Sequence, residues 1–406
     1  MKAVCLGGAG AMSASLEYDL HKTSDFDEIV VADFDEGKAG HIIDLMDGDK
    51  RFSFAKLDAT KKEEIAKVLK GADCVFDGLP DQFVFNFMDV VSEMGINGVT
   101  LSSIGITDER LAKYSDALKK KGNTVLLNSG GGTITSVMDI LGCEELDEVE
   151  EINEYWSLWR PITQATPGLI YAAMQFDPKS RGRVYWENGE YVRNLPPFAL
   201  PKDWEFPEPI GKQETHIIEH GEPMPPFIPA IMQKGLKRVV CRGVFHYGWT
   251  RLARFFLENG IFGAEPIEIN GVKVSPYEVI MKHIERHAAE KWEDSYTIAK
   301  KLGFKPQDIL SAEIIGFKNG MAHRIIYYCE PLYPFFDGKP ANASMEYGSF
   351  VGVAGSVSLQ MLAHGEIPEK GAFNIETSGV SAKKLFNEYE KRGFKFTKQS
   401  SFRTQV

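Results

Sequence analysis

A glycine-rich stretch near the start of the chain, GGAGAMS, is the first pattern that could do chemistry. Gly8 and Gly10 match the first two glycines of G-x-G-x-x-G, and Ser13 stands at the third position. The first glycine permits a tight turn, and the second lets the backbone approach a pyrophosphate. The helix that follows would begin with Ala11 and Met12, whose N–H groups favour phosphates. We therefore predict a dinucleotide-binding turn, with a purely structural turn as the alternative.

An acidic residue at the end of the next apolar run supports this interpretation. EIVVADFD ends its strand pattern with Asp33, about 20 residues after the turn, where a carboxylate accepts the ribose hydroxyls of the adenosine. No lysine or arginine follows directly, and Asp35 adds a second negative charge that would repel a 2′-phosphate. The sequence therefore predicts NAD in preference to NADP.

A second cluster could move a proton and hold a carboxylate. RGVFHYGWTR supplies Arg242, His246, Tyr247 and Arg251 around a glycine. Histidine suits proton transfer because its pKa lies near neutrality, and arginine binds carboxylates through two parallel hydrogen bonds. We expect a catalytic or anchoring loop here. The alternative is a strand and turn with packed aromatic rings and solvated arginines.

Four other residues are weaker candidates. Arg160 could anchor a carboxylate, or it could be a surface cation that rests on Trp159. Tyr171 lies in an apolar stretch, where a tyrosine could equally belong to the core. His216 and His220 alternate with apolar residues and could line a cleft, or they could be partly exposed strand residues.

The sequence predicts no metal site. His283 and His287 share one face of a helix, but the glutamate between them has the wrong offset for H-E-x-x-H and no third ligand is evident, so a solvated face is favoured. The five cysteines (5, 74, 143, 241 and 329) are scattered, odd in number and never in a CxxC pair. This pattern argues against disulfides and zinc, and it predicts a cytoplasmic protein with reduced thiols.

The first 130 residues alternate strand and helix patterns. KAVCLG, EIVVAD, FSFAKLD, DCVFDGLP, GVTLSS and NTVLLN read as six strands, with amphipathic helical stretches between them. Strand–helix alternation of this kind builds a parallel, doubly wound sheet. The fold class is therefore α/β, with a Rossmann domain at residues 1–142.

The alternation of strand and helix patterns ends after this domain. GCEELDEVEEINE is an acidic run that we expect to be a solvated connection, and residues 195–229 are rich in proline and expected to be irregular. EVIMKHIERHAAEKW predicts a long helix, SAEIIGFKNGMAHRIIYYCE a β-hairpin, and GSFVGVAGSVSLQMLAHG a small-residue helix. We expect an α+β substrate and dimerisation domain on a mixed sheet at residues 143–345.

Composition narrows the class of partner. The chain has 406 residues, enough for two domains, with 43% hydrophobic and 25% charged residues. Its formal charge of −11 argues against nucleic acid as a partner. No apolar run reaches the roughly 18 residues that span a membrane, and the start of the chain does not resemble a signal peptide. We expect a soluble protein with a small-molecule substrate.

Several stretches resemble the saccharopine dehydrogenase family, most of all the branch that includes lysine 6-dehydrogenase. LDAT, with Asp58 and Ala59, is similar to the segment that contacts adenine, and DGLP, with Leu79 and Pro80, to the strand end that lines the nicotinamide side. EFPEPIGKQET, FLENGIFGAEPIEINGVKVSPYEVI and the end of the chain resemble later family stretches. The resemblance implies a homodimer, an active site in the cleft between the domains, and a C-terminal segment, residues 346–406, that returns to the Rossmann domain.

The chain departs from the family at its substrate-site motifs. SGGGTITS stands where the family often has a proline-glycine pair, and FHYGW stands where lysine-type members have an Arg-Tyr-Pro-Gly-His-like turn. Thr166 replaces the asparagine that usually precedes the proline at position 167. These departures argue against carrying over lysine as the substrate.

The reaction that the resemblance implies is NAD-dependent oxidation of a CH–NH or CH–NH₂ group of an amino acid or related amine, or the reverse imine reduction. One alternative is an opine-type or saccharopine-type reductive condensation of an amino acid with a keto acid, which needs two carboxylate anchors. Another is a non-catalytic NAD-binding sensor, which would bind the cofactor without turning over any amine.

Overall fold

The computed structural model describes residues 1–102, 109–159, 183–218, 223–245, 249–261, 265–280, 282–283, 301, 307–331, 335–339, 341, 345–346 and 348–403. The chain forms two compact units. The first combines Met1–Leu141 with Pro331–Ala341 and Met345–Phe394, and the second contains Gly142–Glu330, Asn342–Ser344 and Lys395–Val406.

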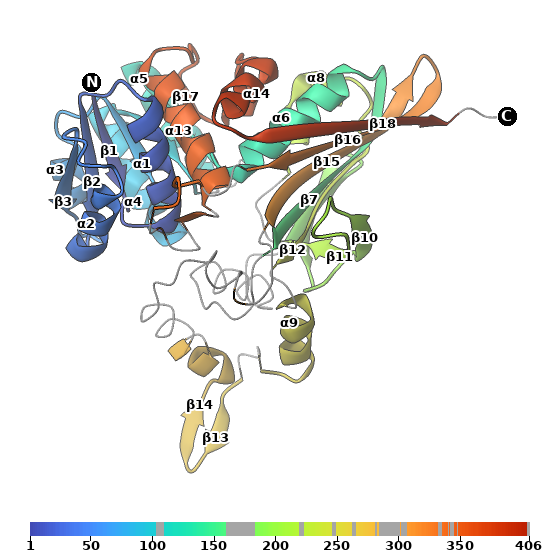
Figure 1. Cartoon of the computed structure of the whole chain (residues 1–406), viewed down its shortest axis with the longest axis horizontal. Coiled ribbons are helices and arrows are strands. Elements are labelled where there is room, and N and C mark those ends of the chain that lie inside the picture. Colours follow the sequence, from blue (N-terminus) through green and yellow to red (C-terminus); the bar gives the residue numbers. More distant parts are fainter. Residues whose placement is uncertain are drawn as a thin grey trace. The chain divides into compact units, whose positions relative to one another are not determined.

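The first unit is built on a seven-stranded sheet with the order β17-β6-β5-β4-β1-β2-β3, in which every pairing is parallel (Figure 1). The sheet reverses its direction of growth between β1 and β4, as in the Rossmann fold. The predicted α/β class with a Rossmann sheet is therefore confirmed. Its strands are β1 (Lys2–Leu6), β2 (Glu28–Asp33), β3 (Phe52–Lys56), β4 (Cys74–Asp77), β5 (Asn97–Thr100), β6 (Thr124–Leu126) and β17 (Gly371–Phe373).

Helices cover both faces of this sheet. On one face, residues of α3, α4 and α5 share a single apolar core with β1, β2 and β4. On the other face α13 crosses α1 so closely that a Cβ on Gly352 would lie 2.5 Å from the Leu16 nitrogen. The helices are α1 (Ala11–Thr23), α2 (Glu36–Asp44), α3 (Lys62–Val68), η1 (Asp81–Phe83), α4 (Val84–Met94), α5 (Glu109–Lys121), α6 (Gly131–Glu144), α13 (Ser349–Ala363), η3 (Ile375–Thr377) and α14 (Ala382–Lys391). The small-residue helix predicted near residue 355 is confirmed as α13.

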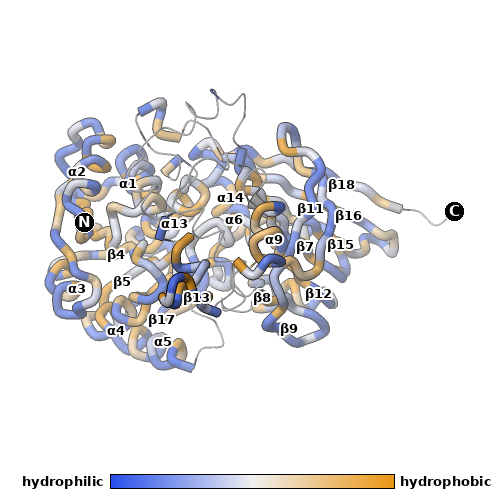
Figure 2. The backbone as a smooth tube through the Cα atoms, turned by 90° about the horizontal axis from the view of Figure 1, so that it is seen from below, coloured by the Kyte–Doolittle hydropathy of each residue, from blue (hydrophilic) through white to orange (hydrophobic). Residues whose placement is uncertain are grey.

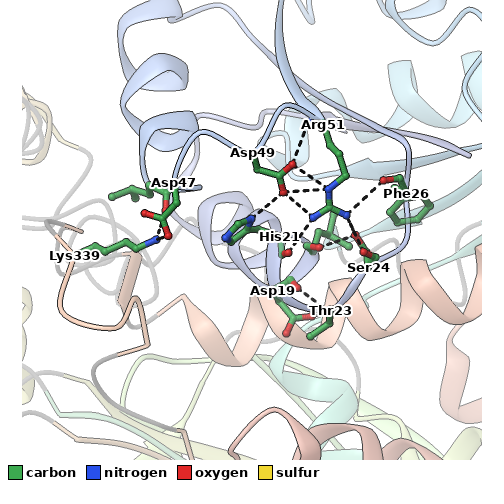
Figure 3. A network of polar contacts seen from close by, with 11 residues as sticks. Asp19, His21, Thr23, Ser24, Phe26, Asp47, Asp49, Arg51 and Lys339 are labelled. Atoms are coloured by element: carbon green, nitrogen blue, oxygen red, sulfur yellow. Dashed lines mark hydrogen bonds and ion pairs between the residues drawn. The ribbon is translucent and has the colours of Figure 1, made fainter.

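A polar network holds the C-terminal end of α1 to the segment before β3 (Figure 3). Arg51 donates to the carboxylate of Asp49 and, through its terminal nitrogens, to the carbonyl oxygens of His21 and Ser24 at 2.9 and 2.7 Å. His21 Nδ1 lies 2.9 Å from Asp49 Oδ2, the oxygen that also accepts from Arg51 Nη2 at 2.7 Å. These contacts hold the pKa of Asp49 well below its usual range, chiefly through the hydrogen bond from Arg51. The network anchors the far end of α1, the helix that begins directly after the glycine-rich turn.

The second unit is built on a mixed sheet with the order β10-β11-β12-β7-β15-β16-β18, to which β8 and β9 add. β12 runs parallel to β7, and β15 and β16 form the predicted hairpin around Asn319 and Gly320, both at positive φ. β18 is largely hydrophilic (Figure 2) and pairs with β16. The strands are β7 (Glu148–Trp159), β8 (Arg183–Glu187), β9 (Glu190–Leu195), β10 (Lys202–Glu205), β11 (Lys212–Ile217), β12 (Arg238–Phe245), β15 (Gln307–Lys318), β16 (Met321–Glu330) and β18 (Lys395–Arg403). A separate hairpin joins β13 (Ile267–Ile269) to β14 (Val272–Val274), and the helices are η2 (Pro225–Phe227), α8 (Pro229–Met232) and α9 (Trp249–Glu258).

The prediction of a solvated acidic connection after the first domain is wrong. Only three residues separate α6 from β7, and the second half of the acidic run is the start of β7, a central strand. Val149 and Ile152 are fully buried there, while Glu150 pairs with Lys237. A cation from a distant part of the chain therefore helps a glutamate-rich strand to lie at the centre of a sheet.

Two other predictions for this region have mixed outcomes. The proline-rich stretch is irregular in part, but it contains β10 and β11. The long helix predicted at EVIMKHIERHAAEKW lies mostly outside the described residues. In the part of the chain that the structure describes, no helix is both long and apolar enough to cross a membrane.

Candidate cofactor and active site

The turn after β1 has a shape that only glycines allow. Gly7 has φ +66°, and a Cβ there would lie 2.9 Å from the carbonyl oxygen of Gly78. A Cβ on Gly8 would lie 2.7 Å from both Glu17 Oε1 and Val31 Cγ1. Gly10 is the N-cap of α1, and a Cβ on it would lie 3.0 Å from the Gly7 oxygen. Because these glycines carry no side chain, the backbone of the turn is bare, as the close approach of a pyrophosphate requires.

The N-terminus of α1 is open to an anion. The N-cap residue offers no side-chain cap, and the first turn carries no acidic residue. Ala11 and Met12, the first two helical residues, are partly exposed. Their N–H groups and the positive end of the helix dipole therefore suit phosphate oxygens.

Ser13 occupies the third glycine position without disturbing the turn. Its hydroxyl donates to the Gly7 carbonyl at 2.9 Å and is buried. A Cβ on Gly78 would lie only 2.3 Å from that hydroxyl oxygen. The serine is therefore accommodated because the residue that follows β4 is a glycine, a compensation that the spacing of the turn does not reveal.

Asp33 connects the end of β2 to the glycine-rich turn. One carboxylate oxygen accepts from Ala9 N–H at 3.0 Å, and the other accepts from Asp35 N–H at 2.9 Å. Asp35 is the N-cap of α2 and accepts from Lys38 N–H, which lowers the pKa of Asp35. Phe34, between the two carboxylates, is 69% exposed. The orientation of Asp33 is fixed, and each of its oxygens keeps a further lone pair for a ribose hydroxyl.

Asp58 and Ala59 follow β3, next to the end of β2. Leu57 N–H donates to the Asp33 carbonyl at 2.9 Å, which places this segment beside the ribose-binding carboxylate. The side chain of Asp58 turns back to Thr60 and Lys61, and these hydrogen bonds lower its pKa to about 2, that from Thr60 most of all. The Ala59 carbonyl accepts from Asn86 at 3.1 Å. The contact that this segment could offer adenine is therefore its backbone rather than the Asp58 carboxylate.

Leu79 and Pro80 follow β4, on the other side of β1 from β2. Pro80 is exposed and Leu79 is partly buried. The predicted cofactor-binding residues thus follow four neighbouring parallel strands, β3, β2, β1 and β4, whose carboxyl ends meet at one edge of the sheet (Figure 1). This edge, at the point where the strand order reverses, is where dinucleotides bind in such sheets.

Two buried carboxyl groups near this edge have no counterpart in the sequence-based prediction. Glu17, on α1, lies under Gly8, and burial raises its pKa well above the usual range, with a further rise from the charge of Asp33. Asp77 ends β4, and burial raises its pKa to about 7. Asp77 is a polar residue at the last position of an apolar strand, and this pattern could have identified it from the sequence. The helix pattern of α1 gives no such signal for Glu17.

Most of the predicted catalytic residues lie outside the described part of the chain: Arg160, Tyr171, His246 and Tyr247. Arg251 lies in the first turn of α9 and its side chain is exposed. No structural observation here places these five residues together, and they stay predictions.

The neighbourhood of α9 contains a second charged group. Arg254, one turn after Arg251, donates to Glu214 at 2.9 Å and lies 3.4 Å from His216 Nε2. His216 is 2% exposed, and burial lowers its pKa. It is thus a buried residue of β11 rather than a partly exposed one, while His220 lies outside the described residues.

Arg242 is part of the sheet rather than of an exposed loop. It is 4% exposed, and it donates to Asn153 Oδ1 at 2.9 Å and to the Leu200 carbonyl at 3.0 Å. Asn153 in turn donates to Glu313, which also pairs with Lys202. This arginine is therefore neither a solvated cation nor free to bind a carboxylate.

No group of three histidine, cysteine, aspartate or glutamate side chains able to hold a metal ion occurs among the residues that the structure describes.

Comparison with known proteins identifies the first unit. Residues 3–126 match the family described as saccharopine dehydrogenase NADP binding domain. Apo saccharopine dehydrogenase (L-Glu forming) from Saccharomyces cerevisiae has a similar structure, with a TM-score of 0.66 and 14% identity over 98% of this chain and 99% of that chain. Amine dehydrogenase from Mycobacterium smegmatis matches with a TM-score of 0.46 and 12% identity over 94% of this chain and 96% of that chain.

The sheet, the bare turn and the family match together define the class of protein, an NAD(P)-dependent dehydrogenase. Within that class, residues 3–126 match the saccharopine dehydrogenase NADP binding domain, and the chain shares the fold of saccharopine dehydrogenase. The resemblance to this family found in the sequence is confirmed by the match over residues 3–126. The lysine 6-dehydrogenase branch stays a prediction.

Proposed function

We propose that the protein is an NAD-dependent oxidoreductase acting on the CH–NH or CH–NH₂ group of an amino acid or related amine, by oxidation or by imine reduction. The observation that carries the proposal is the pairing of the bare turn at Gly8 and Gly10 with the oriented carboxylate of Asp33. The likeness in fold to saccharopine dehydrogenase (L-Glu forming) supports an amino acid or related amine as the substrate.

The preference for NAD rests on charge at the end of β2. Asp33 and Asp35 follow one another closely, and Lys38 is already drawn to Asp35, 3.5 Å away. A second lysine, Lys56, donates to the Phe34 carbonyl. A 2′-phosphate would meet two carboxylates before either lysine, and its repulsion would favour NAD.

Each part of the chain has a distinct task in this proposal. The cofactor supplies hydride transfer when it is bound. The turn and the N-terminus of α1 hold the pyrophosphate, Asp33 holds the ribose, and Leu79 and Pro80 lie on the nicotinamide side. His246 or Tyr247 would move the proton, and Arg251 and Arg160 would hold the substrate carboxylate. Tyr171 is a further candidate on the substrate side.

The experiment is NADH formation by the purified protein with NAD and a panel of amino acids and diamines, alongside the same panel with NADP. Turnover of one amine that is strong with NAD and weak with NADP would support the proposal. Absence of turnover despite NADH binding would contradict simple amine oxidation. The reverse assay, keto acids plus amines with NADH, then separates reductive condensation from a non-catalytic sensor.

Homodimerisation and a cytoplasmic location complete the proposal. Both rest on the sequence, and sedimentation of the purified protein tests the first.

A further inference from the structure

Asp77 is the hub of a hydrogen-bond network at the end of β4. Its side chain is fully buried, yet each carboxylate oxygen has a donor: Leu79 N–H at 3.2 Å for one and the Thr100 hydroxyl at 2.8 Å for the other. Its backbone carbonyl accepts from Leu101 N–H at 3.1 Å. The Thr100 oxygen accepts in turn from Ser102 N–H at 3.0 Å. One carboxylate thus fixes the chain as it leaves both β4 and β5.

This network lies directly against the cofactor turn. Gly78 N–H donates to the Leu6 carbonyl at 3.0 Å, and the Gly78 oxygen is 2.9 Å from where a Cβ on Gly7 would be. In a sheet of this order the adenosine half of a dinucleotide lies over the β2 side of the turn, and the nicotinamide half over the β4 side. The segment held by Asp77 is therefore on the nicotinamide side.

We propose that Asp77 is a positioning residue for the nicotinamide half of the cofactor, which it serves through the backbone of Leu79 and the hydroxyl of Thr100, and that its charged form holds this segment best. The inference rests on the proposed use of a nicotinamide cofactor and adds to it a group that touches no reacting atom. Burying a carboxyl group costs free energy, and the proposed role gives a reason for the burial of Asp77.

The two protonation states differ in how they hold the segment. A carboxylate accepts from both donors at once, and hydrogen bonds to a charged acceptor are about twice as strong as neutral ones. In the neutral acid the oxygen that faces Thr100 carries a proton and donates it to the Thr100 hydroxyl, whose own hydrogen must turn away, while Leu79 N–H keeps only an uncharged acceptor. The Leu79 segment is then held less firmly.

Both states are accessible near neutrality. Burial raises the pKa of Asp77 to about 7, while the hydrogen bonds from Thr100 and Leu79 oppose the rise and the charge of Asp81 adds to it. Among the described residues, Asp81 is the one charged side chain that acts on Asp77. The sequences of β1 near the turn, of β5 and of α13, which pack around it, are uncharged.

The test compares NADH with ADP-ribose, which has the same adenosine and pyrophosphate but no nicotinamide. Dissociation constants for both ligands are measured from pH 6 to pH 8. Repulsion between the pyrophosphate and a charged Asp77 affects both ligands and cancels in their ratio. We expect the affinity of NADH relative to ADP-ribose to rise about tenfold with pH, the worth of one hydrogen bond of ordinary strength.

Two variants separate positioning from mere structure. Asp77→Asn imitates the permanently neutral group. Its affinity for NADH relative to ADP-ribose should therefore be independent of pH and equal to the wild-type value at low pH. Thr100→Val removes the donor that favours the charged form, so the midpoint should move up by about one pH unit. Thr135→Val is the matched control, because that buried hydroxyl bonds to the Gly131 carbonyl instead of a carboxylate.

The proposal is overturned if the wild-type affinity of NADH relative to ADP-ribose does not change with pH. It is also overturned if Thr100→Val leaves the midpoint of that pH dependence in place. Either result leaves the proposed NAD-dependent function intact. If the wild type binds ADP-ribose but NADH no better at any pH, both the positioning role and the proposed nicotinamide chemistry fall. If Asp77→Asn does not fold, the shift in Thr100→Val decides the matter.

Discussion

The carboxylate of Asp33 accepts a hydrogen bond from the backbone N–H of Ala9 at 3.0 Å. The residue that would select the cofactor therefore also shapes the turn that would bind its pyrophosphate. Because the same carboxylate accepts from Asp35 N–H, its position is fixed from both sides before any ligand arrives. A change at Asp33 should thus alter affinity and selectivity together.

Replacing Asp33 by asparagine should weaken NADH binding by about tenfold to a hundredfold, the loss of a hydrogen bond to a charged acceptor. The affinity for NADPH should fall far less, because the substitution also removes a charge that repels the 2′-phosphate. The measurement is the dissociation constant of each cofactor. Asp35→Asn removes the same charge two residues away but keeps a residue that can cap α2, so it is the control. Equal selectivity changes in both variants would show that Asp33 has no special role.

Replacing Gly8 by alanine should cost about 1–3 kcal/mol of stability and most of the affinity for NADH, because the new methyl group meets Val31 and the Glu17 carboxyl. Gly40→Ala is the matched control. Its Cβ would meet nothing within 4 Å, and it lies within α2, where alanine is favoured by roughly 0.5–1 kcal/mol. Thermal unfolding and NADH titration of both variants check this prediction. It fails if the two alanine variants behave alike.

The pairing of Asp49 with Arg51 should make the first unit sensitive to acid. The pKa of Asp49 is lower in the folded state than in the unfolded chain, so its stabilising effect is present above about pH 4 and is lost as pH falls through the folded value. Asp49→Asn should therefore destabilise the protein at pH 7, and the difference from the wild type should shrink steadily as the pH is lowered below about 4. Because two units need not unfold together, hydrogen exchange of the α1 amides is the suitable measurement. Asp44→Asn, at an exposed position at the end of α2, is the control. It should leave the stability unchanged at neutral and at acidic pH.

The first unit was predictable because its signals are local. Short apolar strands bounded by glycine and charge, together with the spacing from Gly8 to Asp33, depend on residues that are near in sequence. β7 was missed because its signal is not local. Its glutamates are tolerated by partners such as Lys237, which lies 87 residues from Glu150. A single sequence does not disclose such pairs.

The candidate site divides in the same way. Gly8, Gly10 and Asp33 follow from a known spacing, whereas Gly7 and Asp77 matter only because β4 lies beside β1. Arg242 shows the opposite error. Its position in a motif with His246 suggested a shared role, but strand pairing directs it into a network with Asn153. Membership of one short motif therefore says little about which face of a sheet a side chain joins.

Arg251 is the described residue that can test the substrate side of the proposal. If it binds a substrate carboxylate, Arg251→Gln should raise the KM of the amine by about tenfold to a hundredfold, the worth of a charge-assisted hydrogen bond, with little change in NADH affinity. Arg193→Gln, at an exposed position of β9, is the matched control and should leave both constants unchanged. Steady-state kinetics on the amine found in the panel provides the measurement. A fall in kcat at unchanged KM would assign Arg251 to the organisation of α9 and of its neighbour Arg254 instead, and the carboxylate anchor would then have to be sought elsewhere.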